Sequence, residues 1–144
     1  MGLTIAVYDT KENLLKKYPI NDTMLNIDEE TGEVYINDTS NGNIKINNII
    51  IEKKLGNISR INMLNDEFRK LLKNNSIILS KILYNGSHCG DVIKINDFEI
   101  LKNEINLVKK NIFQSTKIEI ISFLDTLLEV IKIAERYNKP IVFI

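Results

Sequence analysis

The stretch ISFLDTLLEVIKIAERYNKPIVFI at residues 121–144 decides the class of fold. Its first part predicts a helix, because apolar residues recur three or four positions apart and so share one face. The residues of this face are Ile121, Leu124, Leu128, Ile131 and Ala134. Asn138 and Pro140 mark the end of the helix. The apolar run at 141–144 predicts a final strand packed inside the protein, because an exposed apolar strand promotes aggregation.

Two further helices are expected upstream, where apolar residues repeat at the same spacing. They cover residues 61–71 and 98–112. Ser59 is the expected N-cap of the first helix. Asn96 and Glu99 form the expected capping box of the second helix, since the acid follows the cap by three residues.

Runs rich in Ile and Val predict the strands of a sheet. The expected strands cover residues 3–8, 49–51, 77–84, 92–93 and 141–144. A hairpin is expected to join residues 34–36 to residues 44–46, because Asn41 and Gly42 between them tolerate the positive φ of a tight turn. A short helical segment over residues 11–18 would stop before the proline that follows it.

The order of these elements indicates an α+β fold with a mostly antiparallel sheet and about three helices packed on one face. No repeated strand–helix–strand rhythm points to a parallel sheet. At 144 residues the chain fits one domain, residues 1–144. A domain of this length buries a sufficient core without disulfides or bound metals.

The composition excludes several classes of function. The 19 basic and 19 acidic residues balance, so the chain lacks the basic excess of a protein that binds nucleic acid directly. With one cysteine, Cys89, and one histidine, His88, it forms neither an internal disulfide nor a Cys/His zinc site. The N-terminus lacks the features of a signal peptide, and the apolar runs are too short to span a membrane. We expect a cytoplasmic protein without metal, cofactor or membrane contact.

Residues 86–91, Gly-Ser-His-Cys-Gly-Asp, gather the polar and reactive side chains of the chain. One interpretation makes His88, Cys89 and Asp91 the base, nucleophile and orienting group of a small enzyme. The other makes the segment a tight loop whose two glycines supply unusual backbone angles and whose Asp91 bonds within the loop. The sequence contains no phosphate-binding or nucleophile-elbow motif, so we favour the loop and expect no catalytic residue.

Negative charge is concentrated between Tyr18 and Ile44, a span without Lys or Arg. Its acids are Asp22, Asp28, Glu29, Glu30, Glu33 and Asp38. Such a segment steers a basic partner, or it is simply a solvated polar turn. The spacing does not match the Asp-x-Asp-x-Asp-Gly pattern of a calcium loop. The residues we predict to bind a partner are Asp28, Glu29, Glu30, Glu33 and Asp38.

Two segments and the first five residues carry a resemblance to a known family. One is the Tyr84–Asp91 loop with the following Leu101, Glu104 and Leu107, and the other is the tail at 123–144. Over these residues the chain resembles bacterial polymorphic-toxin immunity proteins, and most of all the immunity protein 70 family. The resemblance implies a small cytosolic protein that binds and neutralises a cognate toxin domain, such as a nuclease. It brings no catalytic or contact residues.

Two other functions stay open at this point. The chain could be a small enzyme that uses the His88-Cys89-Gly90-Asp91 loop, or a structural protein associated with a phage. Exposed edges of the expected hairpin would also allow a homodimer, because an unpaired strand edge can pair with a second copy.

Overall fold

The computed structural model of the chain describes residues 2–37, 44–112 and 118–144. Its main sheet has four strands in the order β4-β1-β6-β5, and each neighbouring pair is antiparallel. These strands are β1 (Gly2–Tyr8), β4 (Ile49–Asn57), β5 (Val92–Ile93) and β6 (Ile141–Phe143). The predicted α+β class with a mostly antiparallel sheet is confirmed.

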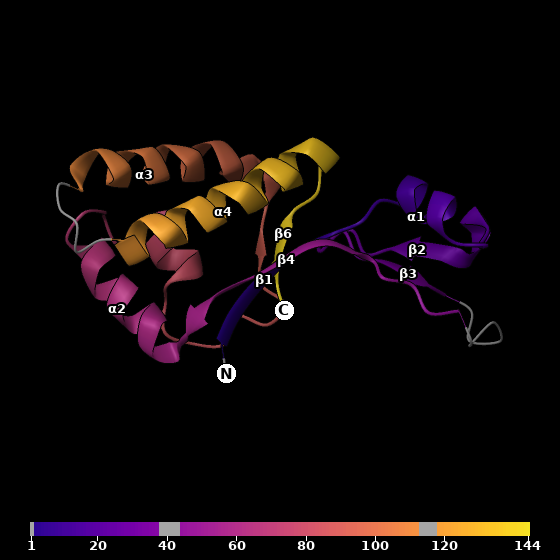
Figure 1. The fold of residues 1–144 in the computed structure, drawn as a ribbon, viewed down its shortest axis with the longest axis horizontal. Coiled ribbons are helices and arrows are strands. Elements are labelled where there is room, and N and C mark those ends of the chain that lie inside the picture. Colours follow the sequence, from indigo (N-terminus) through magenta and orange to yellow (C-terminus); the bar gives the residue numbers. More distant parts are fainter. Residues whose placement is uncertain (1, 38–43, 113–117) are drawn as a thin grey trace.

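Three helices lie together on one side of this sheet (Figure 1). They are α2 (Ile58–Arg69), α3 (Phe98–Asn111) and α4 (Ile118–Tyr137). Their apolar faces and the alternate residues Leu3, Ile5 and Val7 of β1 form the main core. At its centre the rings of Phe68 and Phe123 meet edge to face with centroids 5.6 Å apart.

A smaller group of elements lies beyond the ends of β1 and β4 (Figure 1). It contains α1 (Lys11–Lys17), a 3-10 helix at Asp22–Met24, and the paired strands β2 (Leu25–Ile27) and β3 (Val34–Ile36). These elements bury a separate cluster of Leu14, Ile20, Leu25 and Val34. We call residues 9–48 the small lobe, and β1 together with residues 49–144 the main lobe.

The predicted hairpin between residues 34–36 and 44–46 is wrong. Residues 34–36 form β3, which pairs with β2, so that Leu25 faces Ile36 and Ile27 faces Val34. The real turn is set by Asp28, whose side chain accepts backbone hydrogen bonds, and by Gly32 at φ 74°. The predicted Asn41-Gly42 turn lies outside the described residues, and residues 44–48 form no strand.

The predicted strand at 77–84 is also wrong, because the backbone forms a π-helical turn at Ile78–Ile82. The Glu104 carboxylate of α3 accepts hydrogen bonds from the backbone N–H groups of Ile77 and Ile78 at 2.9 and 3.0 Å. A short apolar run fits a buried strand and a buried helical turn equally well by its pattern. A distant acid therefore decides the conformation.

The ends of the helices differ in detail from the predictions. The N-cap of α2 is Asn57 rather than Ser59, since Asn57 Oδ1 accepts from Arg60 N at 2.8 Å. Asp97 occupies the N-cap position of α3, and Asn96 belongs to a 3-10 turn at Ile95–Asp97 instead of a capping box. Each predicted cap is therefore one or two residues away from the observed one.

The buried face of α4 matches the predicted one in part, since Leu124, Ile131 and Ala134 are buried as predicted. Ile121 is 42% exposed, whereas Ile120, Phe123 and Leu127 are buried. The predicted stop is correct, because Asn138 adopts φ 53° directly after the helix. The short helix at 11–17 and the strands at both ends of the chain are confirmed. Within the described ranges no helix is both long enough and apolar enough to cross a membrane.

Candidate functional site

Four of the five predicted partner-binding acids lie at the turn between β2 and β3. Asp28, Glu29 and Glu30 are exposed, and Glu33 is half-buried where β3 begins. We call these four residues the acidic turn. Asp38, the fifth predicted residue, lies outside the described residues.

Hydrogen bonds hold the acidic turn in one conformation. Asp28 Oδ1 accepts from the backbone N–H groups of Glu30 and Thr31, both at 2.9 Å. Asp28 N donates to Glu33 O, and Gly32 N donates to Asp28 O, both at 2.8 Å. The bonds to Asp28, above all that from Thr31 N, keep its carboxyl pKa below the usual value. The turn therefore presents a preformed acidic surface.

A buried lysine of the main lobe forms a hydrogen bond to the backbone of the acidic turn. Lys139 lies between α4 and β6, is 8% exposed, and its Nζ donates to Gly32 O at 2.7 Å. Burial lowers the pKa of Lys139, and the nearby Asp9 carboxylate partly opposes this shift. Asp9 is itself 1% exposed and accepts from Thr10 N and Asn13 Nδ2 at the start of α1. The junction of the two lobes is thus built from buried polar groups with partners.

Tyr8 lies at the end of β1, where the chain enters the small lobe. Burial raises the pKa of its phenol, and the charges of Glu33, Asp28 and Cys89 raise it further. The loop at 86–91 is itself bonded to the end of β6, where Gly90 N donates to Phe143 O and Phe143 N donates to Asp91 O.

A cavity of about 430 Å³ opens beside the acidic turn. Glu29 and Glu30 line one part of it, and Lys94, Ile95 and Pro140 of the main lobe line the rest. The charged side chains of this lining, Glu29, Glu30 and Lys94, form no ion pair within the described part of the chain. The cavity thus combines two carboxylates and one lysine with two apolar side chains.

The loop at 86–91 holds His88 by packing. The imidazole stacks on Tyr84 with ring centroids 3.9 Å apart and lies 5.2 Å from the ring of Phe143. Its Nδ1 lies 3.0 Å from Gly86 O, a carbonyl that can only accept, so this nitrogen carries the proton. Gly90 adopts φ 87°, as the loop interpretation expects, but Gly86 does not have a positive φ.

The three candidate catalytic side chains of this loop do not form a relay. The Asp91 carboxylate accepts from the Tyr84 hydroxyl, and this hydrogen bond raises the pKa of Tyr84 to about 12. The Asp91 carboxylate is therefore bonded to Tyr84 and not to the His88 ring, while Cys89 is exposed. Neither of the two cavities described here is lined by residues 86–91.

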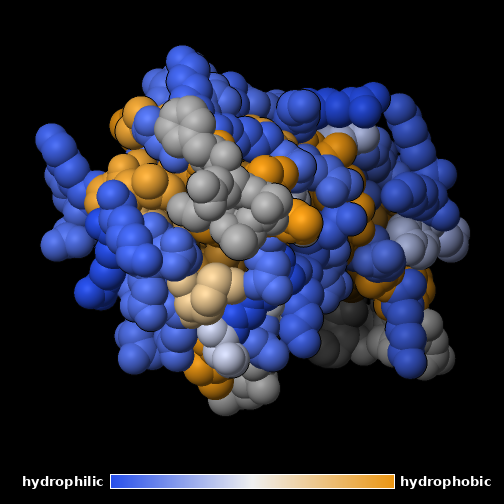
Figure 2. Space-filling model, turned by 60° about the vertical axis from the view of Figure 1, so that its left-hand side comes forward, coloured by the Kyte–Doolittle hydropathy of each residue, from blue (hydrophilic) through white to orange (hydrophobic). Residues whose placement is uncertain are grey.

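Exposed apolar side chains form a different kind of surface on the main lobe. Ile100 and Leu107 of α3 are 54% and 49% exposed, and Ile118 of α4 is 72% exposed. Figure 2 shows hydrophobic residues in separate patches among hydrophilic ones on the side where the three large helices lie. No described contact indicates a partner for these patches, so the acidic turn is the better candidate for a binding surface.

Sequence reasoning missed Lys139, Asp9 and Tyr8, which shape the surroundings of the acidic turn. Their roles depend on contacts between the lobes, and a lone lysine before Pro140 gives no signal of burial. In the described part of the chain, no three His, Cys, Asp or Glu side chains come together as metal ligands. Comparison of the chain with protein-family models, curated proteins and solved structures finds no match.

Proposed function

We propose that this chain is an inhibitor of the immunity-protein kind, which binds and neutralises a basic toxin domain in the bacterial cytoplasm. The observation that carries the proposal is the preformed acidic turn, whose backbone is fixed before any partner arrives by hydrogen bonds to the Asp28 carboxylate and by backbone bonds within the turn. A surface that is already ordered loses little conformational freedom on binding. The resemblance to the immunity protein 70 family supports the same function.

The distribution of charge supports a basic partner. The small lobe has eight acids and four bases, whereas residues 49–144 have eleven acids and fifteen bases. A neutral protein thus carries net charges of −4 and +4 on its two parts. The negative lobe would attract a cationic surface, such as the substrate-binding face of a nuclease, and would raise the rate of association.

Apolar side chains next to the acidic turn supply candidate anchors. Ile27 is 45% exposed at the end of β2, and Tyr35 is 42% exposed on β3. Tyrosine is enriched among the few central residues that dominate binding energy, whereas charges at the rim mainly set rate and specificity. We therefore assign Tyr35 to the centre of the contact and the carboxylates to its edge.

The test is co-expression with the toxin domain encoded next to the gene. Cells that carry the wild-type chain should survive, and purified toxin should bind it with a rate that falls as salt rises. The variant Glu29→Gln/Glu30→Gln/Tyr35→Ala should lose protection while keeping its unfolding transition. A matched control, Glu52→Gln/Asp66→Asn on the main lobe, should still protect. Survival no better than with an empty vector would contradict the proposal for that toxin.

A further inference from the structure

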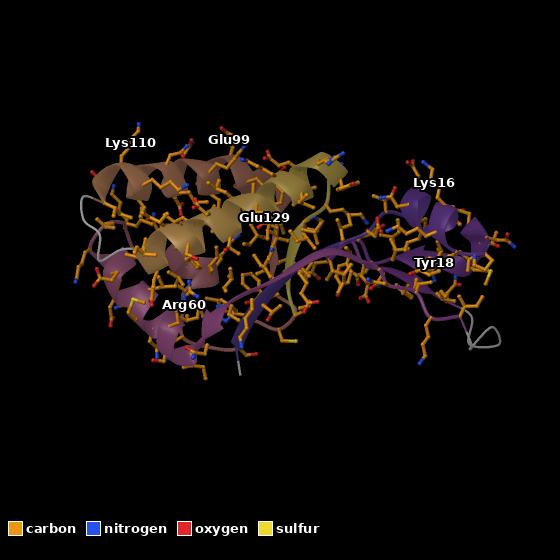
Figure 3. All side chains as sticks on the ribbon, in the orientation of Figure 1. Lys16, Tyr18, Arg60, Glu99, Lys110 and Glu129 are labelled. Atoms are coloured by element: carbon orange, nitrogen blue, oxygen red, sulfur yellow. The ribbon has the colours of Figure 1, made fainter. Side chains whose placement is uncertain are left out.

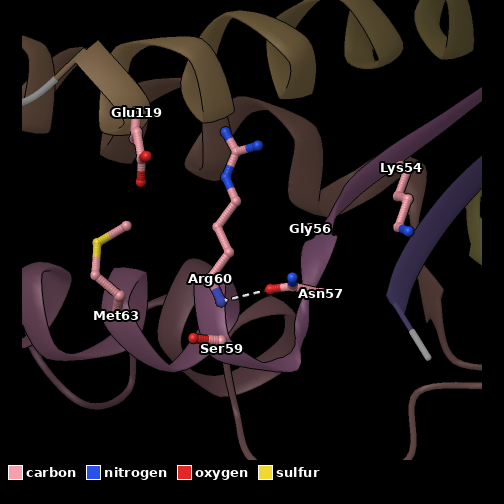
Figure 4. Close-up of a pocket in the computed structure, with 7 residues that line it drawn as sticks. All are labelled: Lys54, Gly56, Asn57, Ser59, Arg60, Met63 and Glu119. Carbon is pink, nitrogen blue, oxygen red and sulfur yellow. Dashed lines mark hydrogen bonds between the residues drawn. The ribbon is translucent and has the colours of Figure 1, made fainter.

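A second cavity, of about 590 Å³, opens in the main lobe where β4 leads into α2 (Figure 4). Its volume lies within the range of small-molecule sites. The side chains that line it are Lys54, Asn57, Ser59, Arg60, Met63 and Glu119. Figure 3 places Arg60 in the main lobe, far from Lys16 and Tyr18 of the small lobe. The cavity is therefore separate from the acidic turn.

The cationic groups of this cavity are unpaired within the described residues. Neither Lys54 nor Arg60 forms an ion pair there, and Arg60 Nε is shielded from solvent without a hydrogen-bond partner. Glu119 of α4 lines the same cavity but forms no ion pair with Arg60. A guanidinium with an unused N–H favours an incoming acceptor, and an oxyanion is the strongest one available.

The backbone fixes the position of Arg60. A Cβ on Gly56 would lie 2.8 Å from Arg60 Cδ, so only a glycine lets the arginine stem cross the end of β4. The backbone N–H of Arg60 donates a hydrogen bond to Asn57 Oδ1 at 2.8 Å. Gly2 plays the same part for the other cation, since its Cβ would lie 2.6 Å from Lys54 Cε. Both charges thus stand on stems that pack over glycine.

We propose that this cavity binds a small phosphate ester that carries hydroxyl groups, such as a sugar phosphate. Arg60 donates hydrogen bonds to the phosphate, with Ser59 and Lys54 contributing at its edge. Glu119 accepts from hydroxyl groups on the opposite wall, and Met63 contacts the carbon skeleton. This ligand class matches the cavity because it combines a dianion for the arginine with donors for the carboxylate.

The experiment is isothermal titration calorimetry of the full chain with ribose 5-phosphate. Saturable binding is expected, with weaker binding of inorganic phosphate and none of ribose. Arg60→Gln should weaken binding about tenfold or more, because it removes a charge-assisted hydrogen bond. Arg69→Gln, which removes an exposed arginine from the last turn of the same helix, is the matched control and should bind as wild type does.

Two more variants separate a binding role from a structural one. Glu119→Gln should weaken ribose 5-phosphate more than inorganic phosphate, because only the sugar has hydroxyl groups for the carboxylate. Gly56→Ala should weaken both ligands by displacing the arginine stem. The proposal is overturned if ribose 5-phosphate does not bind, if ribose binds as tightly, or if Arg60→Gln and Arg69→Gln behave alike. None of these outcomes bears on toxin binding.

Discussion

Replacing Gly32 by alanine tests whether the acidic turn is held against the main lobe. Gly32 has φ 74°, a left-handed conformation that costs alanine about 1–2 kcal/mol. The new methyl group would lie 3.1 Å from Lys139 Cδ and 3.2 Å from Pro140 Cδ, and overpacking of this kind costs about 1–3 kcal/mol. We therefore expect Gly32→Ala to lower the free energy of unfolding by about 2–5 kcal/mol.

Gly90→Ala is the matched control for this change. Gly90 also has a positive φ, 87°, but no heavy atom lies within 4 Å of the position of its Cβ. Its substitution should therefore lower the free energy of unfolding by about 1–2 kcal/mol, the backbone cost alone. Urea denaturation followed by far-UV circular dichroism gives both free energies by linear extrapolation.

The difference between the two variants measures the packing of the acidic turn on the junction with α4. Equal losses of stability in Gly32→Ala and Gly90→Ala would refute the reasoning, since the close approach to Lys139 would then cost nothing. A larger loss in Gly90→Ala would refute it as well, because that residue has open space around its Cβ.

Three other predictions concern the turn, the loop and the core. Asp28→Asn should keep the stability of the turn and slow association with a basic partner, whereas Asp28→Ala should lower both stability and rate; urea denaturation and stopped-flow binding distinguish the two. The raised pKa of Tyr84 in the folded chain means that the stability it contributes is complete below pH 10 and is lost as the pH rises through about 12. Between pH 9 and pH 12 the free energy of unfolding should therefore fall more steeply with pH for the wild type than for Tyr84→Phe. Equal slopes for the two proteins would exclude the hydrogen bond between Tyr84 and Asp91. Phe68→Ala should cost about 3–5 kcal/mol because its ring is fully buried against Phe123, whereas the exposed Ile118→Ala should change the unfolding free energy by less than about 0.5 kcal/mol.

Local patterns in the sequence were sufficient for elements with one clear buried face. The helices at 61–71, 98–112 and 121–137 and the strands at both ends were found because apolar spacing reports burial directly. The strand prediction at 77–84 was wrong for a physical reason. Most residues of this segment are buried, so its apolar pattern fits the period of a strand and that of a helix equally well. Its conformation is set by Glu104, which lies 27 residues from Ile77 in sequence.

The candidate surface shows the same division between local and distant causes. The acids at 28–33 were identified because charge is visible in sequence, although their hairpin was paired with the wrong segment. Asn41-Gly42 is a strong turn signal, so the sequence favours a hairpin around it. The strand Leu25–Ile27 has three residues, which are too few to show an alternating pattern that would predict a strand. Lys139 was missed because its partner, Gly32 O, is 107 residues away.

If the chain binds its partner as proposed, the contact between Lys139 and Gly32 favours that binding because it fixes the acidic turn relative to the main lobe. A mobile turn would lose about 0.5–1.5 kcal/mol of conformational freedom for each side chain ordered by a partner. The bonds within the turn and the tie to Lys139 remove part of that loss before binding. Lys139 follows Asn138, whose left-handed backbone turns the chain from α4 into β6. The segment that leads from α4 into β6 therefore also positions the acidic turn. A substitution that loosens the contact between Lys139 and Gly32 should weaken binding of the partner even when every carboxylate of the turn is present.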